Sequence, residues 1–223
     1  MLIVEELHLL LLRPDGRVEN AVSVHRLYGE IAAVIVDLAL HGRVRIAEGK
    51  NPVLEIVSAE PTGNPVLDVA LAKLVPLHGK KVQSLVMRSG LDPLESVVES
   101  LVVQGVLVRG ERGFFGWGSE RTPESDPGPE RLLRSRLAAV LAGHVPPTAA
   151  DQALLSILQG LGAAHALLRE EAAGMSAGEL KKRIGALAED SAAGDAVAKA
   201  VSTAVSAALM AAMTPVIVAA TIT

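Results

Sequence analysis

Residues 27–57, LYGEIAAVIVDLALHGRVRIAEGKNPVLEIV, decide how the N-terminal part of the chain folds. In residues 27–40 the large aliphatic side chains recur at steps of three and four, which is the spacing of one face of an α-helix. Those side chains are Leu27, Ile31, Val34, Ile35 and Leu38. Gly42 follows where a glycine commonly ends a helix. Residues 44–46 and 53–57 then read as two strands, so the stretch predicts a helix followed by a β-hairpin.

A looser copy of this pattern occupies residues 91–117. Residues 91–103 are amphipathic, and their inward-facing positions are Leu94, Val97, Val98 and Leu101. Gly105 again follows the predicted helix, and residues 106–108 have the character of a strand. We expect a turn and then a return strand over residues 114–117, which read Phe-Phe-Gly-Trp. The chain therefore contains two predicted helix–hairpin units, similar to winged-helix units.

Most of the remaining chain is predicted to be helical. The predicted helices cover residues 2–12, 66–74, 130–141, 149–168 with a break near Gly160–Gly162, 176–187 and 195–213. Residues 119–129 are polar and rich in Pro, Glu and Asp, which predicts a solvated loop. The fold class is therefore mainly α with two small β-hairpins. We expect a single domain over residues 1–223, with a helix and wing half at 1–118 and a helical half at 129–223.

Two apolar segments near the termini bear on membrane insertion. Glu5 and Glu6 precede the apolar run at residues 9–12, whereas an export signal carries positive charge before its apolar run, so we expect no export. Residues 201–223 contain no charged side chain and are long enough to cross a bilayer. Their many Ala, Ser and Thr residues and the interruption at Pro215 instead favour a buried core helix.

Composition excludes several classes of function. The chain of 223 residues has a net charge of −4, so no overall field attracts it to polyanions. It has no cysteine, which excludes disulfides, thiolate catalysis and zinc ribbons and favours the reducing cytoplasm. Aromatic residues make up 2 % of the chain, too few to form stacking platforms for single-stranded nucleic acid.

The sequence contains no motif for catalysis, for a metal or for a cofactor. The six histidines lack the spacing of metal ligands, and we expect them to be exposed or partly hydrogen-bonded. Glu5 and Glu6, like the adjacent acids at 170–171 and 189–190, point about 100° apart on a helix, so we interpret them as solvated faces. The glycines at 160–162 lie in a predicted helix with no preceding strand, which argues against a dinucleotide site. We expect a protein without enzymatic activity.

Two surface features remain as candidate binding residues. Basic side chains lie near the predicted hairpins, and a guanidinium group binds phosphate oxygens in a planar, bidentate arrangement. The candidates for an anionic headgroup are Arg43, Arg45, Arg88, Arg109 and Arg112. Aromatic side chains on a hairpin suit insertion into a membrane interface or a partner's groove. The candidates for this role are Phe114, Phe115 and Trp117.

Four short blocks of sequence occur in order over residues 1–118. Residues 5–12 (EELHLLLL) precede an Asp-Gly-Arg turn, and residues 37–46 read DLALHGRVRI. Residues 61–68 read PTGNPVLD, and residues 101–107 read LVVQGVL. In this order the blocks resemble the Golgi phosphoprotein 3 family, which has an ELALRGR block, a PTGDxLLD segment and an LVEKGVL segment. The chain looks like a bacterial member.

The resemblance implies a helical core ringed by amphipathic helices, with a protruding β-hairpin. It also implies a non-enzymatic adaptor, because eukaryotic members are peripheral membrane proteins that bind phosphatidylinositol 4-phosphate and the cytoplasmic tails of Golgi glycosyltransferases. The family's headgroup site falls here on four apolar residues, Val22, Ile31, Leu91 and Leu94. Arg26 and Arg88 lie close to these positions in sequence and are candidates to replace the family's basic residues.

Three hypotheses follow from these features. The leading one is a cytoplasmic, peripheral protein at the inner face of the membrane that binds anionic phospholipid, including phosphoinositide, through the arginines and the aromatic hairpin. A winged-helix DNA-binding module is an alternative, although the helix at 27–40 carries Glu30 and Asp37 and no basic residue. A homo-oligomer formed through the hairpin is the other alternative.

Overall fold

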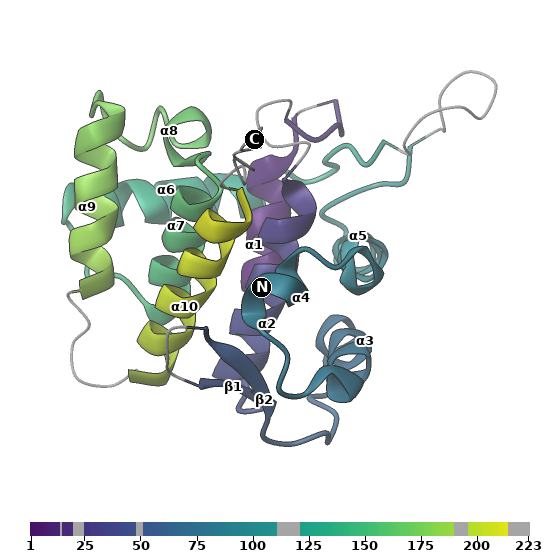
Figure 1. The fold of residues 1–223 in the computed structure, drawn as a ribbon. Helices are drawn as coiled ribbons and strands as arrows, with labels where there is room; N and C mark the ends of the chain where they lie inside the picture. Colours follow the sequence, from purple (N-terminus) through teal and green to yellow (C-terminus); the bar gives the residue numbers. More distant parts are fainter. Residues whose placement is uncertain (14, 20–24, 48–50, 111–120, 190–195, 214–223) are drawn as a thin grey trace, which may run out of the picture.

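Helix α1 (Ile3–Leu11) lies in the middle of the molecule, and the other elements surround it (Figure 1). The computed structural model describes residues 1–13, 15–19, 25–47, 51–110, 121–189 and 196–213. Within these residues the protein is mainly α, with ten α-helices and one small antiparallel sheet of two strands. The predicted fold class is therefore confirmed.

The helices agree closely with the segments predicted from the sequence. The long helix of the opening stretch is α2 (Arg26–Leu40), and it lies beside α1. The others are α3 (Pro65–Leu74), α4 (Val82–Val86), α5 (Leu94–Val103), α6 (Gly128–Ala142), α7 (Ala149–Gly160), α8 (Ala164–Leu167), α9 (Ala177–Glu189) and α10 (Ala196–Met213), with short 3₁₀ turns η1 (Val75–Leu77) and η2 (Ser89–Leu91). In Figure 1, α6 to α9 lie on one side of α1, and α3 and α5 lie on the other.

The ends of α2 and α5 explain why the sequence pattern occurs twice. Gly42 follows α2 with a positive φ of 67°, and the backbone N–H of Arg43 donates to the carbonyl of Leu38. Gly105 follows α5 with a φ of 73°, and the N–H of Val106 donates to the carbonyl of Leu101 in the same way. These are glycine-dependent helix ends that turn the chain sharply into an extended segment.

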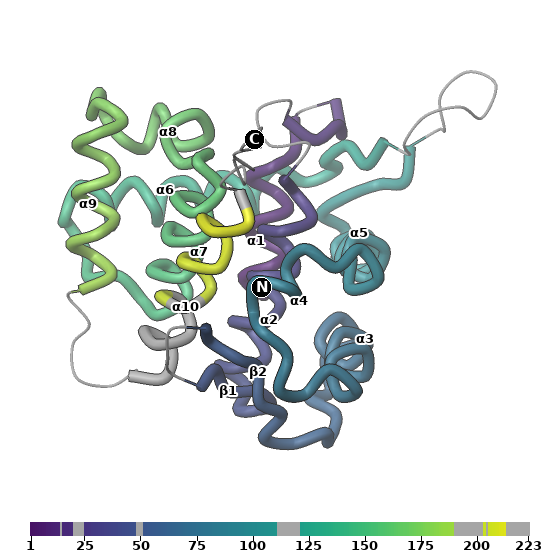
Figure 2. The backbone as a smooth tube through the Cα atoms, in the orientation of Figure 1, coloured from purple at the N-terminus to yellow at the C-terminus, as the bar shows by residue number. Residues whose placement is uncertain are grey.

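The first predicted hairpin is confirmed, and the second differs from the prediction. Strands β1 (Val44–Ala47) and β2 (Val53–Ile56) pair antiparallel, with Arg45 opposite Glu55. After α5, residues 106–110 pair with residues 121–126, through the bridge of Leu107 with Glu124 and the bond from Val108 N–H to the carbonyl of Pro123 (Figure 2). Apart from this bridge, residues 121–127 lack regular secondary structure and most of them are exposed or partly exposed, as predicted for a solvated loop, whereas Thr122 is buried. The return strand expected at residues 114–117 lies outside the described residues.

The C-terminal helix α10 packs against the N-terminal elements. It contacts α2, α4, α7 and β1, and Val205 and Leu209 on it are fully buried. The described part of the predicted segment is thus a core helix. Among the described residues, no helix is both long enough and apolar enough to span a membrane.

Helix α1 is buried over its whole length, so the prediction that Glu5 and Glu6 lie on a solvated face is wrong. These two residues are 2 % and 7 % exposed. His8 is 1 % exposed and is hydrogen-bonded through one of its two ring nitrogens, which agrees with the prediction of partly hydrogen-bonded histidines. The helix is buried because it has neighbours on every side, namely α2, α5, α6 and α7. A helix that is apolar around most of its circumference belongs in a core.

Asp37 of α2 holds the N-terminus of α1. Its Oδ1 accepts from the N–H of Ile3 at 3.0 Å, and its Oδ2 accepts from the N–H of Val4 at 3.0 Å. These N–H groups have no partner within the helix, and the helix dipole favours a negative charge at this end. Burial nevertheless raises the pKa of the Asp37 carboxyl to about 7, against the lowering effect of the two N–H groups and with help from nearby Glu5 and Glu6.

We predict that Asp37 makes the protein less stable as pH rises from about 4 to about 7. Because the pKa of Asp37 is raised in the folded state, the folded state binds more protons than the unfolded state in this window. The free energy of unfolding therefore falls as the carboxyl ionises. Urea denaturation should show the stability of wild type relative to Asp37→Asn falling by roughly 2–4 kcal/mol across the window. Asp15→Asn, at a half-exposed carboxyl, is the matched control. If the difference in stability between wild type and variant is independent of pH for both variants, the assignment to Asp37 is wrong.

Candidate functional site

Each polar side chain of α1 is bound by a different neighbouring helix. Glu5 Oε1 accepts from Ser100 Oγ at 2.6 Å and from Gln104 Nε2 at 2.9 Å, both at α5. Glu6 Oε2 accepts from Arg136 of α6 at 2.7 Å, and Arg136 also binds Asp151 of α7 at 2.7 Å. Buried charges persist in proteins when they are paired and hydrogen-bonded in this way.

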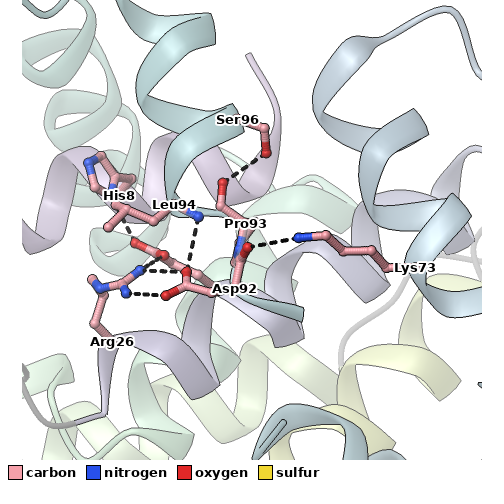
Figure 3. Close-up of polar contacts among 8 residues, drawn as sticks. His8, Arg26, Lys73, Asp92, Pro93, Leu94 and Ser96 are labelled. Carbon is pink, nitrogen blue, oxygen red and sulfur yellow. Dashed lines mark hydrogen bonds and ion pairs between the residues drawn. The ribbon is translucent and has the colours of Figure 1, made fainter. Parts of the chain in front are cut away.

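His8 begins a chain of buried and partly buried polar groups that leads from α1 to the start of α5. Its Nδ1 lies 2.8 Å from Glu30 Oε1 of α2, and Glu30 also binds Arg26. Arg26 in turn donates from Nη2 to Asp92 Oδ2 at 2.7 Å, and Asp92 Oδ1 accepts the N–H of Leu94 at 3.0 Å (Figure 3). The chain His8–Glu30–Arg26–Asp92 therefore ties α1, α2 and α5 together.

The ionisation of this chain follows from its pairing. Burial disfavours the charge on Arg26, but the hydrogen bond to Asp92 and the charges of Glu30 and Asp92 outweigh it and raise the pKa of the guanidinium. Burial likewise opposes ionisation of Asp92, but the hydrogen bonds from Arg26 and from the N–H of Leu94 lower the pKa of its carboxyl. Arg26 and Asp92 are both charged at neutral pH.

A pocket of about 270 Å³ opens beside this chain. It is lined by side chains from α1, α2 and α5 and from the turns next to them, including His8, Arg17, Arg26, Leu94, Arg109 and Thr122. Gly16 forms part of the wall, where its φ is 75° and a Cβ would lie 2.4 Å from the backbone nitrogen of Pro123. Glycine is thus required for the turn at residues 13–17 to close on the segment that follows residue 120.

A second hollow, of about 620 Å³, lies between α3 and α5. Its charged residues are Lys73, Asp92, Glu95 and Glu99, so acidic groups outnumber basic ones. Three arginines and a histidine line the smaller pocket, which we call the α1–α2–α5 pocket. For an anionic ligand the smaller pocket is therefore the better candidate.

The predicted headgroup arginines lie in several places. Arg43 donates to three backbone carbonyls, those of His41, Glu60 and Pro61, and so fixes the chain after β2. Arg45 pairs across the sheet with Glu55. Both side chains therefore have partners that hold the sheet and the following turn.

The other predicted residues differ in how far the structure describes them. Arg109 lines the α1–α2–α5 pocket and pairs with Glu95 at 2.8 Å and Glu99 at 2.7 Å. Arg88 is exposed between α4 and α5, and its guanidinium has no hydrogen bond or ion pair within the part of the chain that the structure describes. Four predicted residues lie outside the described residues, namely Arg112, Phe114, Phe115 and Trp117.

Reasoning from the sequence missed the most buried members of the site. His8 and Glu30 were expected to have no particular role, yet they form the inner wall and its support. The available signal was in α1, where Glu5, Glu6 and His8 interrupt an apolar run without forming a polar face. Within the described residues, no group of three or more His, Cys, Asp or Glu side chains has a geometry that could hold a metal ion.

The described part of the chain is a mainly α protein with one small antiparallel sheet. The family model described as Golgi phosphoprotein 3 (GPP34) matches residues 3–208, and the chain belongs to that family. The family is one of non-enzymatic adaptors. A search of curated proteins found no match.

The family's headgroup positions can now be located in the structure. Ile31 and Leu91 are buried, and Val22 lies outside the described residues. Leu94 lines the α1–α2–α5 pocket, and Arg26 lies in the wall of the same pocket. Arg26 and Leu94 thus line the same pocket, and Leu94 is one of the positions on which the resemblance places the headgroup site.

We predict that Arg26 is required for stability because it neutralises Glu30, which is fully buried. Arg26→Ala leaves a buried carboxylate without a cation, which costs about 3–5 kcal/mol in comparable cases. Urea denaturation should show this loss when Arg26→Ala is made in the wild-type protein. In the Glu30→Gln background, Arg26→Ala should cost less than half as much. Arg131→Ala, at an exposed arginine, should change stability by less than about 0.5 kcal/mol. An equal cost for Arg26→Ala in both backgrounds would refute the coupling.

Proposed function

We propose that the protein is a non-enzymatic, peripheral membrane adaptor that binds the phosphate of an anionic phospholipid in the α1–α2–α5 pocket. The proposal rests on the position of three arginines, Arg17, Arg26 and Arg109, which line one pocket together with Leu94. Guanidinium groups are the side chains best suited to bind phosphate oxygens in pairs. Membership of a family of adaptors supports the same function.

The arginines of the pocket differ in how easily they can turn to a ligand. Arg26 is bound to fully buried Glu30, so its role is to support the wall. Arg109 pairs with Glu95 and Glu99, whose side chains are 84 % and 59 % exposed, and Arg17 lies 3.8 Å from half-exposed Asp15. Exposed ion pairs are worth only about 0–1 kcal/mol, so exchanging these carboxylates for phosphate costs little. Arg17 and Arg109 are therefore the proposed phosphate ligands.

Membrane attachment needs more than one weak contact. An arginine near an anionic leaflet contributes about 1 kcal/mol, so Arg43, Arg45, Arg88 and Arg112 add only modest attraction. In our proposal Phe114, Phe115 and Trp117 supply the apolar anchor, and the pocket supplies the specific contact. Two such signals together give stable binding where one alone does not. The proposed location is the inner, cytoplasmic face of the membrane.

DNA binding is the weaker alternative. A recognition helix must present its side chains to the major groove. In α2 every residue from Gly29 to Ala39 is buried against other elements, so this helix cannot enter a groove. Oligomer formation through the aromatic hairpin is the other alternative, and sedimentation of Phe115→Asp against wild type separates it from membrane insertion.

We predict that the double variant Arg17→Gln, Arg109→Gln binds anionic vesicles at least tenfold more weakly than wild type. The loss of two charge-assisted hydrogen bonds to phosphate gives this magnitude, at about 1.4 kcal/mol for each factor of ten. Cosedimentation with phosphatidylcholine vesicles containing phosphatidylinositol 4-phosphate measures it. The double variant Arg131→Gln, Arg169→Gln changes net charge equally at two exposed arginines and should bind like wild type.

Two further conditions in the same assay test the anchor and the electrostatic component. Binding should fall as salt is raised, because screening weakens contacts between exposed charges. Trp117→Ala should abolish stable cosedimentation by removing the largest apolar side chain proposed to insert. If wild type fails to sediment with any anionic vesicle, the proposed function is wrong.

A further inference from the structure

One residue that lines the α1–α2–α5 pocket, His8, has a buried polar atom without a partner. The His8 ring is 1 % exposed and lines the pocket, and its Nδ1 is hydrogen-bonded to Glu30. Its other nitrogen, Nε2, is buried and has no hydrogen bond to any of the residues that the structure describes. A buried polar atom without a partner is unfavourable, so such an atom in a side chain that lines a pocket points to a ligand.

Glu30 determines which nitrogen of His8 carries the proton. A carboxylate can only accept, so the Nδ1 that faces it must be the N–H of the neutral ring. Nε2 then carries a lone pair and accepts hydrogen bonds. When the ring takes up a proton, Nε2 becomes an N–H donor and can bind an anionic oxygen. The ring therefore offers opposite hydrogen-bonding properties in its two states.

We propose that His8 is a ligand-binding residue whose Nε2 donates to a phosphate oxygen, and that the ring takes up one proton from solvent when the phosphate enters the pocket. This inference rests on the proposed function and names a further residue of the same site. The proton adds to Nε2 of the neutral ring, and the resulting imidazolium lies between two anions, the Glu30 carboxylate and the bound phosphate.

In this proposal the bound phosphate changes the charge balance around His8. From α2 the ring faces Glu30 and Arg26, which carry opposite charges and pair with each other. Arg17 and Arg109 line the same pocket, where Arg17 is paired with Asp15 and Arg109 with Glu95 and Glu99, and Asp92 is paired with Arg26. Each of these arginines already has a carboxylate partner, and a bound phosphate adds further negative charge to the pocket that His8 lines. Phosphate binding and proton uptake are therefore coupled.

Calorimetry at pH 8 tests the coupling, because an unperturbed imidazole is neutral there. The whole chain is titrated with glycerol 3-phosphate, and separately with phosphatidylcholine vesicles containing phosphatidic acid, in two buffers of different ionisation enthalpy. The difference in heat gives the number of protons taken up, which we expect to be about one per phosphate bound. Between pH 7.5 and 8.5 the affinity should fall about tenfold for the same reason.

Two variants of His8 assign the proton to this ring. His8→Asn retains a side-chain donor toward Glu30 but lacks a group at Nε2, so uptake should vanish and binding should weaken about tenfold. His8→Gln places an amide near Nε2 that does not titrate, so binding should become independent of pH. His144→Gln, at an exposed histidine, should take up the same proton as wild type. Circular dichroism establishes that each variant is folded.

The outcomes separate this inference from the proposed function. Binding without proton uptake, or uptake that persists in both folded His8 variants, overturns the role of His8 and leaves headgroup binding intact. If either variant fails to fold, the other variant and the pH dependence of wild type decide the question. If the protein binds the vesicles but not glycerol 3-phosphate, the ligand is a lipid. If it also binds glycerol 3-phosphate, the phosphate group is sufficient for binding. If neither ligand binds, both proposals fail.

Discussion

The complete burial of α1 is the constraint on which the rest of the structure depends. This helix carries Glu5, Glu6 and His8 into the centre of the protein, where polar groups need partners. Their partners come from α5, from α6 and α7, and from α2. Because each bond extends from α1 to a different neighbour, the positions of the surrounding helices are coupled through the polar side chains of one short helix as well as through apolar packing.

The α1–α2–α5 pocket is a consequence of this arrangement. The chain from His8 through Glu30 and Arg26 to Asp92 holds the wall rigid, while Arg17 and Arg109 at its rim pair with carboxylates that are exposed. Buried ion pairs resist rearrangement, whereas an exposed ion pair can exchange its carboxylate for another anion at a small cost in free energy. The pocket therefore combines a paired interior with arginines whose carboxylate partners are exposed, which supports the proposed binding of phosphate.

Local sequence patterns predicted the elements of the fold well. The α2–β1–β2 unit follows from apolar spacing and from Gly42, which alone permits the left-handed turn that redirects the chain. The pairing of residues 106–110 with residues 121–126 was not predictable in this way, because the second segment contains Pro123 and lacks alternation. That pairing depends on contacts with the distant turn at Gly16.

The candidate site was predicted only in part, for the same physical reason. Arg109 was named from local charge, and Arg26 from its nearness to a family position. His8 and Glu30 are 22 residues apart, and nothing local to either residue predicts their pairing. Only the lack of a polar face around Glu5, Glu6 and His8 indicated that these residues are internal.

In our proposal the buried network leaves Nε2 of His8 without a protein partner, and a phosphate group supplies one. Nitrogen-15 NMR of the His8 ring at pH 8, before and after saturation with glycerol 3-phosphate, tests it most directly. We expect Nδ1 to carry the proton and Nε2 to be unprotonated in the free protein. In the complex we expect Nε2 to be protonated as well. A proton on Nε2 of the free, neutral ring, or an Nε2 that remains unprotonated at saturation, would contradict it.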